Sequence, residues 1–554
     1  NEDGTDRRYQ FTAFRSANLD SLWPLGPFQG YHIDHPIPWP VSDTPGEFEF
    51  PKVPGYLERI RKESSGKVTR FSCTEPSYEG TMFPMTQWML EKAENDPDII
   101  IQTEKDKQAP VVGRVLIGNN SRLNYYHPVA RDYIRGYLKS FAEDLTSQTP
   151  VNYFMTAWEG APGHVGYNPS SQAAFRAYLK ERYGSIASLN KKWQTKYASF
   201  EAIEIPYEQY DSPAGEVSGL TYEFERWRRL NYVRRIADMR GYLKEGAPNV
   251  PVMTDPSHFM KDGNTYLMYR EHASDIMSFH ANPAAEDPMW VYLDSMNRAF
   301  GRITGYFENY YGMWSRAHLH DERLAKRDFY HFFYKMFLRD VRISAWWLGV
   351  VAHPTRYVTA YNGNSFGLNY DQTIYRWSAT ALPVMFRRGR TIEKALLESR
   401  QEVPKTAIIQ PCASVFNLAS LNRKGNDSDT LTLMFDLHNK LLGPENVAHD
   451  YLPEEMVLDG NGSLDDYTAL FLPYAPYMSK EFSRRLTRWV KKGGTLFAVG
   501  PFALKDECGV DLADRSSLFR TLFPAVKEAA SGDWDYSVDG TNRRARPIET
   551  KAFG

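Results

Sequence analysis

Two glutamates each follow a short apolar run. Glu159 comes directly after the run that includes Phe154 and ends at Trp158, and Glu308 follows residues 303–307. Hydrolysis of a glycosidic bond requires one carboxyl group that holds a proton for the leaving oxygen. It also requires a second carboxyl group that stays ionised and attacks the anomeric carbon. The two glutamates therefore predict sugar chemistry.

Aromatic residues surround both glutamates. Trp158 and Phe154 offer Glu159 an apolar wall, and such a wall keeps a carboxyl group protonated near neutral pH. Tyr306 and Tyr310 flank Glu308, and a tyrosine hydroxyl can hold a carboxylate in its ionised form. Aromatic residues make up 14% of the chain, which fits either a large core or a cleft in which sugar rings stack.

Short apolar segments alternate with longer amphipathic ones up to about residue 400. The eight strand candidates are residues 9–14, 68–73, 114–117, 153–157, 250–254, 276–279, 303–307 and 343–348. Helical patterns over residues 130–145, 172–183, 222–244 and 329–341 separate several of them. Eight buried parallel strands with crossover helices predict a (β/α)8 barrel followed by a smaller α/β domain. The proline-rich stretch 26–55 is expected to be a rim loop.

Catalytic groups of such barrels lie at the carboxyl ends of the strands. Glu159 follows the fourth predicted strand and Glu308 the seventh. The further candidates for substrate binding all lie near the end of a predicted strand: Arg15, Glu75, Asp255, His280, Trp346 and Trp347. Each of these has an ordinary alternative as a core residue or a loop residue with local hydrogen bonds. Glu75, placed after the second predicted strand, is the main rival carboxylate.

A second region begins near Pro404. Strands are expected at residues 406–409, 467–472 and 495–499, with helices at 430–442 and 479–492, the latter stopped by Gly493-Gly494. This alternation predicts a small doubly wound domain over residues 401–525 after a barrel at 1–400. No GxGxxG motif indicates a nucleotide. Residues 526–554 are polar and weakly patterned, and are expected to begin a further segment or domain.

Composition excludes several classes of protein. The net charge of −2 argues against nucleic acid as a partner, and no apolar stretch reaches the length of a membrane span. Three well-separated cysteines form neither a disulfide framework nor a CxxC metal site. Sugar hydrolysis by two carboxyl groups requires no metal and no organic cofactor, so we expect neither. The chain begins at Asn1 without Met, so its localisation stays open between periplasmic or secreted and cytoplasmic.

Two stretches carry a resemblance to a known family. Residues 174–193, with Arg182-Tyr183-Gly184 and Leu189-Asn190, resemble the helix-turn segment that follows the acid/base residue in glycoside hydrolase family 42. Residues 467–501 are similar to the trimerisation domain of these β-galactosidases, so the resemblance implies a flavodoxin-like fold for residues 401–525. The resemblance implies a clan A barrel, with Glu159 as acid/base and Glu308 as nucleophile, and it implies a homotrimer.

Two departures from the family pattern concern specificity. Clan A enzymes usually carry Asn before the acid/base glutamate, where this chain has Trp158, so galactose preference is open and a mannoside is an alternative. The cysteine cluster that binds zinc in many family members is replaced by residues 166–172. The chain is therefore expected to come from a diverged neighbouring family.

The sequence thus predicts a retaining exo-β-glycosidase, similar to a β-galactosidase or a β-mannosidase, that acts on an oligosaccharide or glycoside. One alternative is an inverting or endo-acting barrel hydrolase in which Glu75 or Asp255 is one partner. Another is a barrel that binds carbohydrate without hydrolysing it.

Overall fold

The computed structural model describes most of the chain between residues 10 and 512. The described residues are 10–14, 30–33, 42, 44–51, 53–63, 70–74, 82–104, 107–108, 112–113, 119–157, 166–206, 217–254, 265–278, 283–309, 322–339, 341–347, 376–399, 402–421, 429–500 and 502–512.

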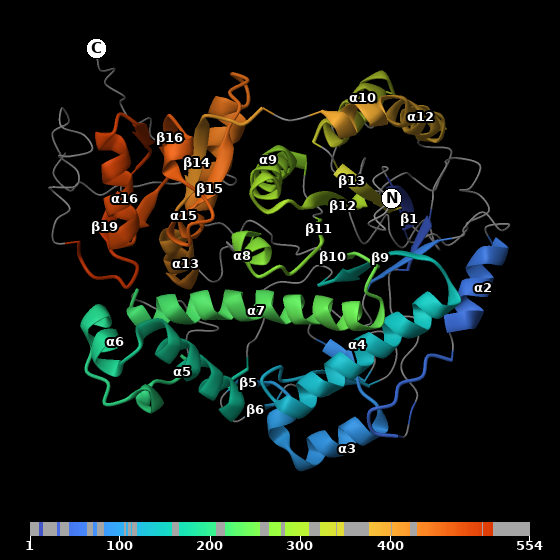
Figure 1. The fold of residues 1–554 in the computed structure, drawn as a ribbon, viewed down its shortest axis with the longest axis horizontal. Helices are drawn as coiled ribbons and strands as arrows, with labels where there is room; N and C mark the ends of the chain where they lie inside the picture. The colour runs from blue at the N-terminus through green and yellow to red at the C-terminus, as the bar shows by residue number, and fades with distance from the viewer. Residues whose placement is uncertain are drawn as a thin grey trace. The chain divides into compact units, whose positions relative to one another are not determined.

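Eight parallel strands close into a barrel (Figure 1). They are β1 (Gln10–Phe14), β2 (Gly30–Ile33), β3 (Phe71–Thr74), β9 (Val151–Thr156), β10 (Val252–Thr254), β11 (Ile276–Met277), β12 (Ile303–Asn309) and β13 (Val341–Trp347). Each strand pairs in parallel with its neighbours in the order β1-β13-β12-β11-β10-β9-β3-β2. The predicted barrel is confirmed, and its eight carboxyl ends meet at one rim.

The strands are short and apolar because helices cover the barrel outside and side chains fill it inside. Tyr153, Phe154 and Met155 of β9 are fully buried, as are Val252 and Met253 of β10. Consecutive residues of one strand point to opposite faces, so burial of successive residues requires cover on both faces. This explains why the strands read as continuous apolar runs.

The second strand of the barrel was not predicted, whereas the predicted strand at residues 68–73 is confirmed as the third, β3. The barrel uses β2, which lies within the stretch assigned to a rim loop, and residues 114–117 lie outside the described part of the chain. Four residues that begin with Gly30 and include His32 give too weak an apolar signal to stand out in a proline-rich stretch. Glu75 therefore follows the third barrel strand. Because one strand was missed and one was added, Glu159 still follows the fourth strand, and Glu308 still belongs to the seventh.

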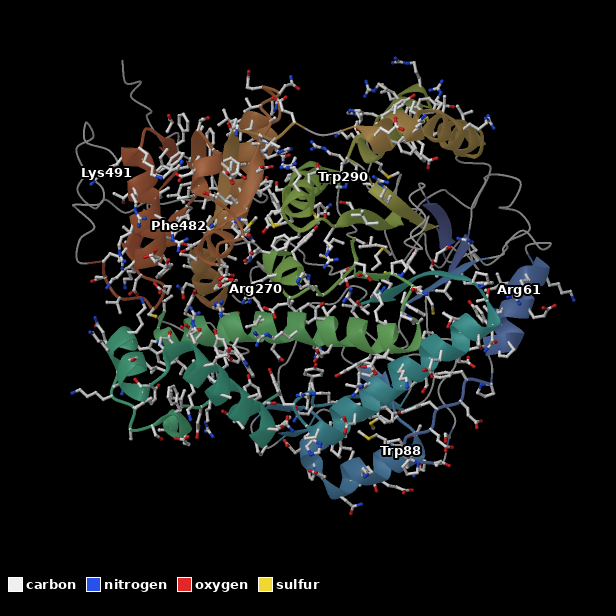
Figure 2. All side chains as sticks on the ribbon, in the orientation of Figure 1. Arg61, Trp88, Arg270, Trp290, Phe482 and Lys491 are labelled. Carbon is white, nitrogen blue, oxygen red and sulfur yellow. The ribbon has the colours of Figure 1, made fainter. Side chains whose placement is uncertain are left out.

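Long helices connect the strands. They are α2 (Val53–Glu63), α4 (Pro128–Gln148), α5 (Pro169–Tyr183), α6 (Ile186–Trp193), α7 (Gly219–Gly246), α8 (Thr265–Arg270), α9 (Pro283–Phe300), α10 (Glu322–Leu338) and α12 (Arg376–Glu398). The predicted apolar face of α4 is confirmed, since Tyr133, Ile134, Tyr137, Leu138 and Phe141 are all buried. On α9, Trp290 is among the largest fully buried side chains (Figure 2).

A small excursion interrupts the barrel between β3 and α4. It contains β4 (Met82–Pro84), α3 (Gln87–Asn95), a 3₁₀ turn (Pro97–Ile99), β5 (Gln102–Glu104), β6 (Lys107–Gln108), β7 (Val112–Gly113) and β8 (Asn119–Arg122). Strands β4, β8 and β7 form one antiparallel sheet, and β5 pairs with β6. The pattern of apolar residues gave no indication of this excursion.

The described contacts divide the chain into two compact units. The first unit comprises Asn1–Leu189, Lys196–Tyr207 and Arg226–Glu402. The second comprises Asn190–Thr195, Glu208–Glu225 and Val403–Gly554. The division falls within α7, whose first residues count with the second unit.

The second unit contains a parallel sheet of four strands in the order β15-β14-β16-β18. Its elements are β14 (Thr406–Gln410), α13 (Cys412–Leu421), α14 (Asp429–Asp436) with a π-helical turn (Leu437–Leu442), β15 (Asp450–Pro453), α15 (Glu454–Leu458), β16 (Ala469–Leu472), β17 (Ala475–Tyr477), α16 (Lys480–Lys491), β18 (Thr495–Ala498) and β19 (Phe502–Lys505). The three predicted strands are confirmed, whereas β15 and α13 were not predicted.

The residues at both ends of helix α16 explain where the helix begins and where it stops. Ser479 caps it, because its Oγ accepts a hydrogen bond from the backbone N–H of Phe482 at 3.2 Å. Phe482, Leu486 and Trp489 are buried on one face. Gly493 follows with a φ of +105°, which an L side chain rarely adopts, so the predicted stop after Lys492 is confirmed.

Candidate active site

The structure gives the backbone of four predicted site residues. Tyr306 and Glu308 belong to β12, where Glu308 is the residue before the last. Trp346 and Trp347 are the last two residues of β13, and Trp346 is the register partner of Asn309 on β12. These four residues therefore lie in adjacent strands toward the shared carboxyl rim. Their side chains are outside the described part of the structure.

The other predicted site residues lie outside the described residues. These are Arg15, Glu75, Trp158, Glu159, Asp255, His280 and Tyr310. In the chain, each comes within three residues after a barrel strand: Glu159, for instance, is separated from Thr156 of β9 by Ala157 and Trp158. The structure thus identifies the strand that each residue follows in the chain.

One pair of polar residues was missed by the sequence analysis. Asp34 and His35 directly follow β2, which was mistaken for loop. The same rule that selected Asp255, a polar residue immediately after a strand, would have selected them had β2 been recognised. Both lie outside the described residues.

Strand β12 pairs irregularly with β13 between Tyr306 and Asn309, the segment that contains Glu308. Tyr306 pairs with Ser344 and Asn309 pairs with Trp346, so three steps along β12 match two steps along β13. The extra residue on β12 is a β-bulge, which bends a strand and redirects a side chain, and bulges are common next to active sites. The bulge occurs in the strand segment that carries the candidate nucleophile.

The backbone is strained two residues before the other glutamate. Ala157 has a φ of +54° and is fully buried. A residue with a side chain pays roughly 1–2 kcal/mol for this left-handed conformation, so its presence demands support from the surroundings. Next to it, the hydroxyls of Thr156 and Thr254 lie 2.9 Å apart and join the ends of β9 and β10. The chain therefore leaves β9 by a sharp turn that directly precedes Trp158 and Glu159.

The backbone of β12 at Gly305 lies close to side chains inside the barrel. A Cβ on Gly305 would lie 2.8 Å from Sδ of Met253 and 3.2 Å from Cγ2 of Ile276. Met253 belongs to β10, two strands away from β12 in the barrel order, so this contact crosses the barrel interior. The interior below the carboxyl rim is thus closely packed, and it gives β12 a firm base.

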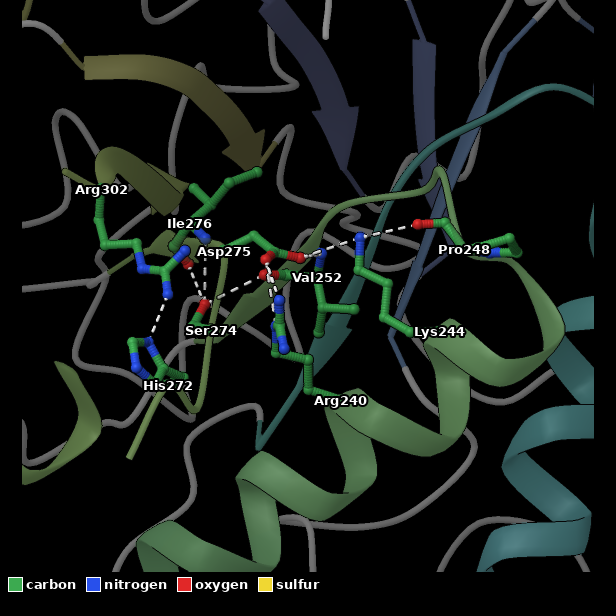
Figure 3. A network of polar contacts seen from close by, with 9 residues as sticks. All are labelled: Arg240, Lys244, Pro248, Val252, His272, Ser274, Asp275, Ile276 and Arg302. Carbon is green, nitrogen blue, oxygen red and sulfur yellow. Dashed lines mark hydrogen bonds and ion pairs between the residues drawn. The ribbon is translucent and has the colours of Figure 1, made fainter. Parts of the chain in front are cut away.

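The opposite rim carries a charged network that is fully described (Figure 3). Asp275 precedes β11, and its carboxylate accepts from Nε of Arg240 at 3.1 Å and from the backbone N–H of Val252 at 2.9 Å. Lys244 Nζ lies 3.2 Å from the same carboxylate. Burial raises the pKa of Asp275, but the Arg240 and Val252 hydrogen bonds and the charges of Lys244 and Arg240 outweigh it, so the pKa falls below its ordinary value. This network ties α7 to the amino ends of β10 and β11.

Two further observations concern groups that bind ions or membranes. Among the described residues, no three His, Cys, Asp or Glu side chains gather as a metal site would require. In the same part of the chain, no helix is long and apolar enough to cross a bilayer.

Comparison with known proteins relates this arrangement to one family. Residues 81–296 match the family model Glyco_hydro_42, described as beta-galactosidase. The chain is 24% identical over 194 residues to beta-galactosidase bgaB of Geobacillus kaustophilus, which covers 33% of this chain and 28% of that protein. It is 34% identical over 97 residues to beta-galactosidase BgaA of Thermus sp., which covers 16% of this chain and 15% of that protein. The matches thus span less than a third of these relatives.

Solved structures agree in fold. The beta-galactosidase of Bacillus circulans sp. alkalophilus superposes with a TM-score of 0.67 at 16% identity, covering 93% of this chain and 74% of that one. An exo-carrageenase of family 42 from Bacteroides ovatus superposes with a TM-score of 0.59 at 13% identity, covering 91% and 67%. In sequence over residues 81–296 and in fold over most of its length, the chain resembles the glycoside hydrolase family 42 β-galactosidases.

Proposed function

We propose that the chain carries the catalytic barrel of a retaining exo-β-glycosidase, similar to a β-galactosidase or a β-mannosidase. Glu159 is its acid/base and Glu308 its nucleophile. The observation that carries the proposal is the order of the two glutamates along one closed parallel barrel: Glu159 comes three residues after the fourth strand, and Glu308 lies in the seventh strand, one residue before its end. The resemblance to family 42 supports it, since the matched residues 81–296 include Glu159.

The reaction proceeds in two displacements. In the first, the Glu308 carboxylate forms a bond to the anomeric carbon while the glycosidic C–O bond breaks and Glu159 donates its proton to the leaving oxygen. In the second, the Glu159 carboxylate takes a proton from water, and the water oxygen attacks the anomeric carbon. The bond to Glu308 then breaks and both carboxyl groups return to their starting states. The proton that Glu159 gives to the leaving oxygen is thus restored from the water molecule, and the oxygen of that water ends on the anomeric carbon.

The anomeric configuration of the product tests the mechanism. Proton NMR at early times should show the β-anomer first, before mutarotation. If the α-anomer appears first, the enzyme inverts, and Glu75 or Asp255 becomes a candidate partner. If a sugar binds and no product forms, the barrel binds carbohydrate without catalysis.

A Glu159→Gln variant tests the acid/base role. It should lose most activity toward alkyl glycosides and keep the formation of the glycosyl-enzyme from dinitrophenyl glycosides, whose leaving group needs no proton. Glu398→Gln is the matched control, since Glu398 is 67% exposed on α12. Full activity of Glu159→Gln toward alkyl glycosides would remove Glu159 from the mechanism.

The sugar itself is tested by a panel of 4-nitrophenyl β-glycosides. Trp158, at the position where clan A enzymes usually carry Asn, leaves galactoside and mannoside as the two leading substrates. The panel should also include glucoside, fucoside and carrageenan oligosaccharides, since one neighbour of the same fold is an exo-carrageenase. We expect a preference for one sugar by at least about tenfold.

We further propose a domain division at residues 1–400, 401–525 and 526–554, in which the second domain is flavodoxin-like and serves assembly as a homotrimer. The sheet order β15-β14-β16-β18 supports the flavodoxin-like assignment, since it corresponds to the order 2-1-3-4 of such sheets. Light scattering should give a mass three times that of one chain, and a mass of one chain contradicts the trimer.

A further inference from the structure

After Glu159, the described residues begin again at Gly166, just before helix α5. Asn168 occupies the N-cap position of α5, where a side chain of its type ordinarily accepts a hydrogen bond from the first turn of the helix. Here it makes no such bond. Its Oδ1 instead accepts the backbone N–H of Gln102 at 2.7 Å, and its Nδ2 donates to the backbone oxygen of Ile100 at 2.8 Å. The residue therefore serves a contact outside its own helix.

The side-chain amide of Asn168 makes the two hydrogen bonds that the backbone of a neighbouring β-strand would make. Residues 100 and 102 present their oxygen and N–H on the same edge of an extended segment, and one side-chain amide satisfies both. Tyr167 adds a backbone bond, since its N–H donates to the Gln102 oxygen at 2.9 Å. Asn168 is 2% exposed. Because buried backbone groups that lose their partner are costly, this pairing holds the start of α5 firmly against the excursion.

Asn124 provides a second attachment between the same two segments. It is fully buried, and its Nδ2 lies 2.8 Å from the Asp98 oxygen and 2.7 Å from Oγ of Ser170. Asp98 belongs to the excursion and Ser170 to the first turn of α5. The N-terminus of α5 is thus fixed at two points by buried amide side chains.

Gly166 makes room for this arrangement. Its φ of +79° is one that L side chains rarely adopt. A Cβ at this position would lie 2.8 Å from Oδ1 of Asn168, the atom that accepts the Gln102 N–H. An alanine would therefore push the amide away from its partners. The glycine and the asparagine act as one unit.

We propose that Asn168, with Gly166 and Asn124, is a positioning residue for the acid/base group. The chain between β9 and α5 is held at Ala157 on one side and at Gly166 and Asn168 on the other, and Glu159 lies in the eight residues between these points. Displacing one end by about an ångström displaces what lies between, and misplacements of this size can cost about a hundredfold in rate. This inference rests on the proposed role of Glu159.

The test compares two variants with matched controls. Asn168→Ala removes the amide, and Gly166→Ala displaces it. Asn95→Ala is the control for the first, since Asn95 donates to the Glu91 oxygen at an exposed site on α3. Gly184→Ala is the control for the second, because Gly184 at the other end of α5 also has a positive φ, of +71°, with no atom within 4 Å of its Cβ. Backbone strain is common to both glycine variants, and only Gly166→Ala disturbs Asn168.

The readout is the ratio of kcat/KM between an alkyl and a dinitrophenyl glycoside of the best sugar. In Asn168→Ala and Gly166→Ala this ratio should fall about 10- to 100-fold, because only the alkyl leaving group needs a proton from the acid/base. Added azide should speed turnover of the dinitrophenyl substrate. Both controls should keep the wild-type ratio. The folded fraction cancels in the ratio, so a variant that is only less stable leaves it unchanged, and this result would overturn the proposal.

Amide hydrogen exchange provides a second test of the proposal, and this test does not depend on catalysis. Peptides that cover residues 158–165 should exchange at least about fivefold faster in Asn168→Ala than in wild type, while those of β9 keep their rates. Unchanged exchange in residues 158–165 overturns the proposal. If wild type hydrolyses no glycoside, the proposed function fails instead, and the exchange result still decides whether Asn168 holds this segment.

Discussion

The two rims of the barrel differ in how their backbone and charges are satisfied. At the amino rim, the carboxylate of Asp275 meets Arg240, Lys244 and a backbone N–H. At the carboxyl rim, Ala157 holds a left-handed conformation, and the pairing of β12 with β13 shifts between Tyr306 and Asn309. Strain that survives in a folded protein often marks a functional site, whereas satisfied charge networks far from the site stabilise the fold.

We therefore distinguish two kinds of carboxylate in the barrel: those at the amino rim, which stabilise the fold, and those at the carboxyl rim, which carry the proposed chemistry. A substitution at the amino rim should change stability and leave the chemistry intact. A substitution at the carboxyl rim should do the reverse. Each prediction below tests one side of this separation.

Replacing the candidate nucleophile should have the largest effect. Glu308→Ala should lower kcat by about 10⁴-fold or more, since an enzyme without its nucleophile keeps only binding and residual electrostatic catalysis. The melting temperature should stay within about 2 °C of wild type, or rise, because active-site groups are seldom optimal for stability. Steady-state kinetics and thermal unfolding measure the two effects. A variant that unfolds but retains kcat would place Glu308 with the structural carboxylates.

A buried carboxylate in the second unit tests whether a perturbed pKa alone marks a catalytic site. Glu454 is fully desolvated, and this burial raises its pKa to about 7, although it accepts hydrogen bonds from the backbone N–H groups of Ala413 and Ser479. The folded state therefore holds a proton that the unfolded state releases above its ordinary pKa. Stability should fall as pH rises from about 4.5 to 7, by roughly 3 kcal/mol, and then level off.

Glu454→Gln should remove this slope, because the glutamine does not titrate. Urea unfolding at several pH values between 4 and 8 measures it. The ratio of kcat/KM between alkyl and dinitrophenyl glycosides should match wild type. A changed ratio would mean that Glu454 influences the acid/base chemistry, and the separation of the two kinds of carboxylate would fail.

Removing Asp275 should cost stability only. Asp275→Ala leaves Arg240 and Lys244 without their partner at a mostly buried site, and should lower the free energy of unfolding by roughly 2 kcal/mol. The pKa of Asp275 lies below its unfolded value, so its contribution is present above the unfolded pKa near 4 and is lost as pH falls through the lower, folded pKa. Urea unfolding at pH 7 and pH 3 should show a smaller difference between variant and wild type at pH 3.

The control for Asp275→Ala is Asp436→Ala. Asp436 pairs with Lys440 at 2.8 Å, and the lysine is 72% exposed, so the change should stay within about 0.5 kcal/mol. The kcat of the folded Asp275→Ala protein should equal that of wild type. A tenfold loss of kcat would show that the amino rim takes part in positioning the site.

The strength of the apolar signal decided which strands could be predicted from the sequence. Continuous apolar runs such as residues 153–157 predicted most barrel strands, because burial on both faces leaves a strong signal in the sequence. Strand β2 was missed because it has only four residues, among them a glycine and a histidine, and therefore leaves a weak apolar signal in the sequence. The tertiary role of Asn168 could not be predicted from the sequence, since an asparagine before Pro169 is typical of a helix N-cap. Its real partners, Ile100 and Gln102, are set by a tertiary contact 66 residues or more away along the chain.

The smallest predicted effect lies inside the barrel, between the two rims. Gly305→Ala places a methyl group 2.8 Å from Sδ of Met253, and the thioether can rotate away, so we expect a loss of about 1 kcal/mol in the free energy of unfolding. Gly241→Ala is the control, since Gly241 lies within α7 with no atom within 4 Å of its Cβ. Greater helix propensity should stabilise that variant by up to about 1 kcal/mol.

The informative quantity for Gly305→Ala is kcat, because this glycine shares β12 with Glu308. If the packed interior supports the carboxyl rim, a shift of β12 should lower kcat about three- to tenfold even though the residue touches no substrate. Gly241→Ala should leave kcat unchanged. An unchanged kcat in Gly305→Ala, together with the loss of stability, would mean that the bulge between Tyr306 and Asn309 isolates the nucleophile from the strand below it.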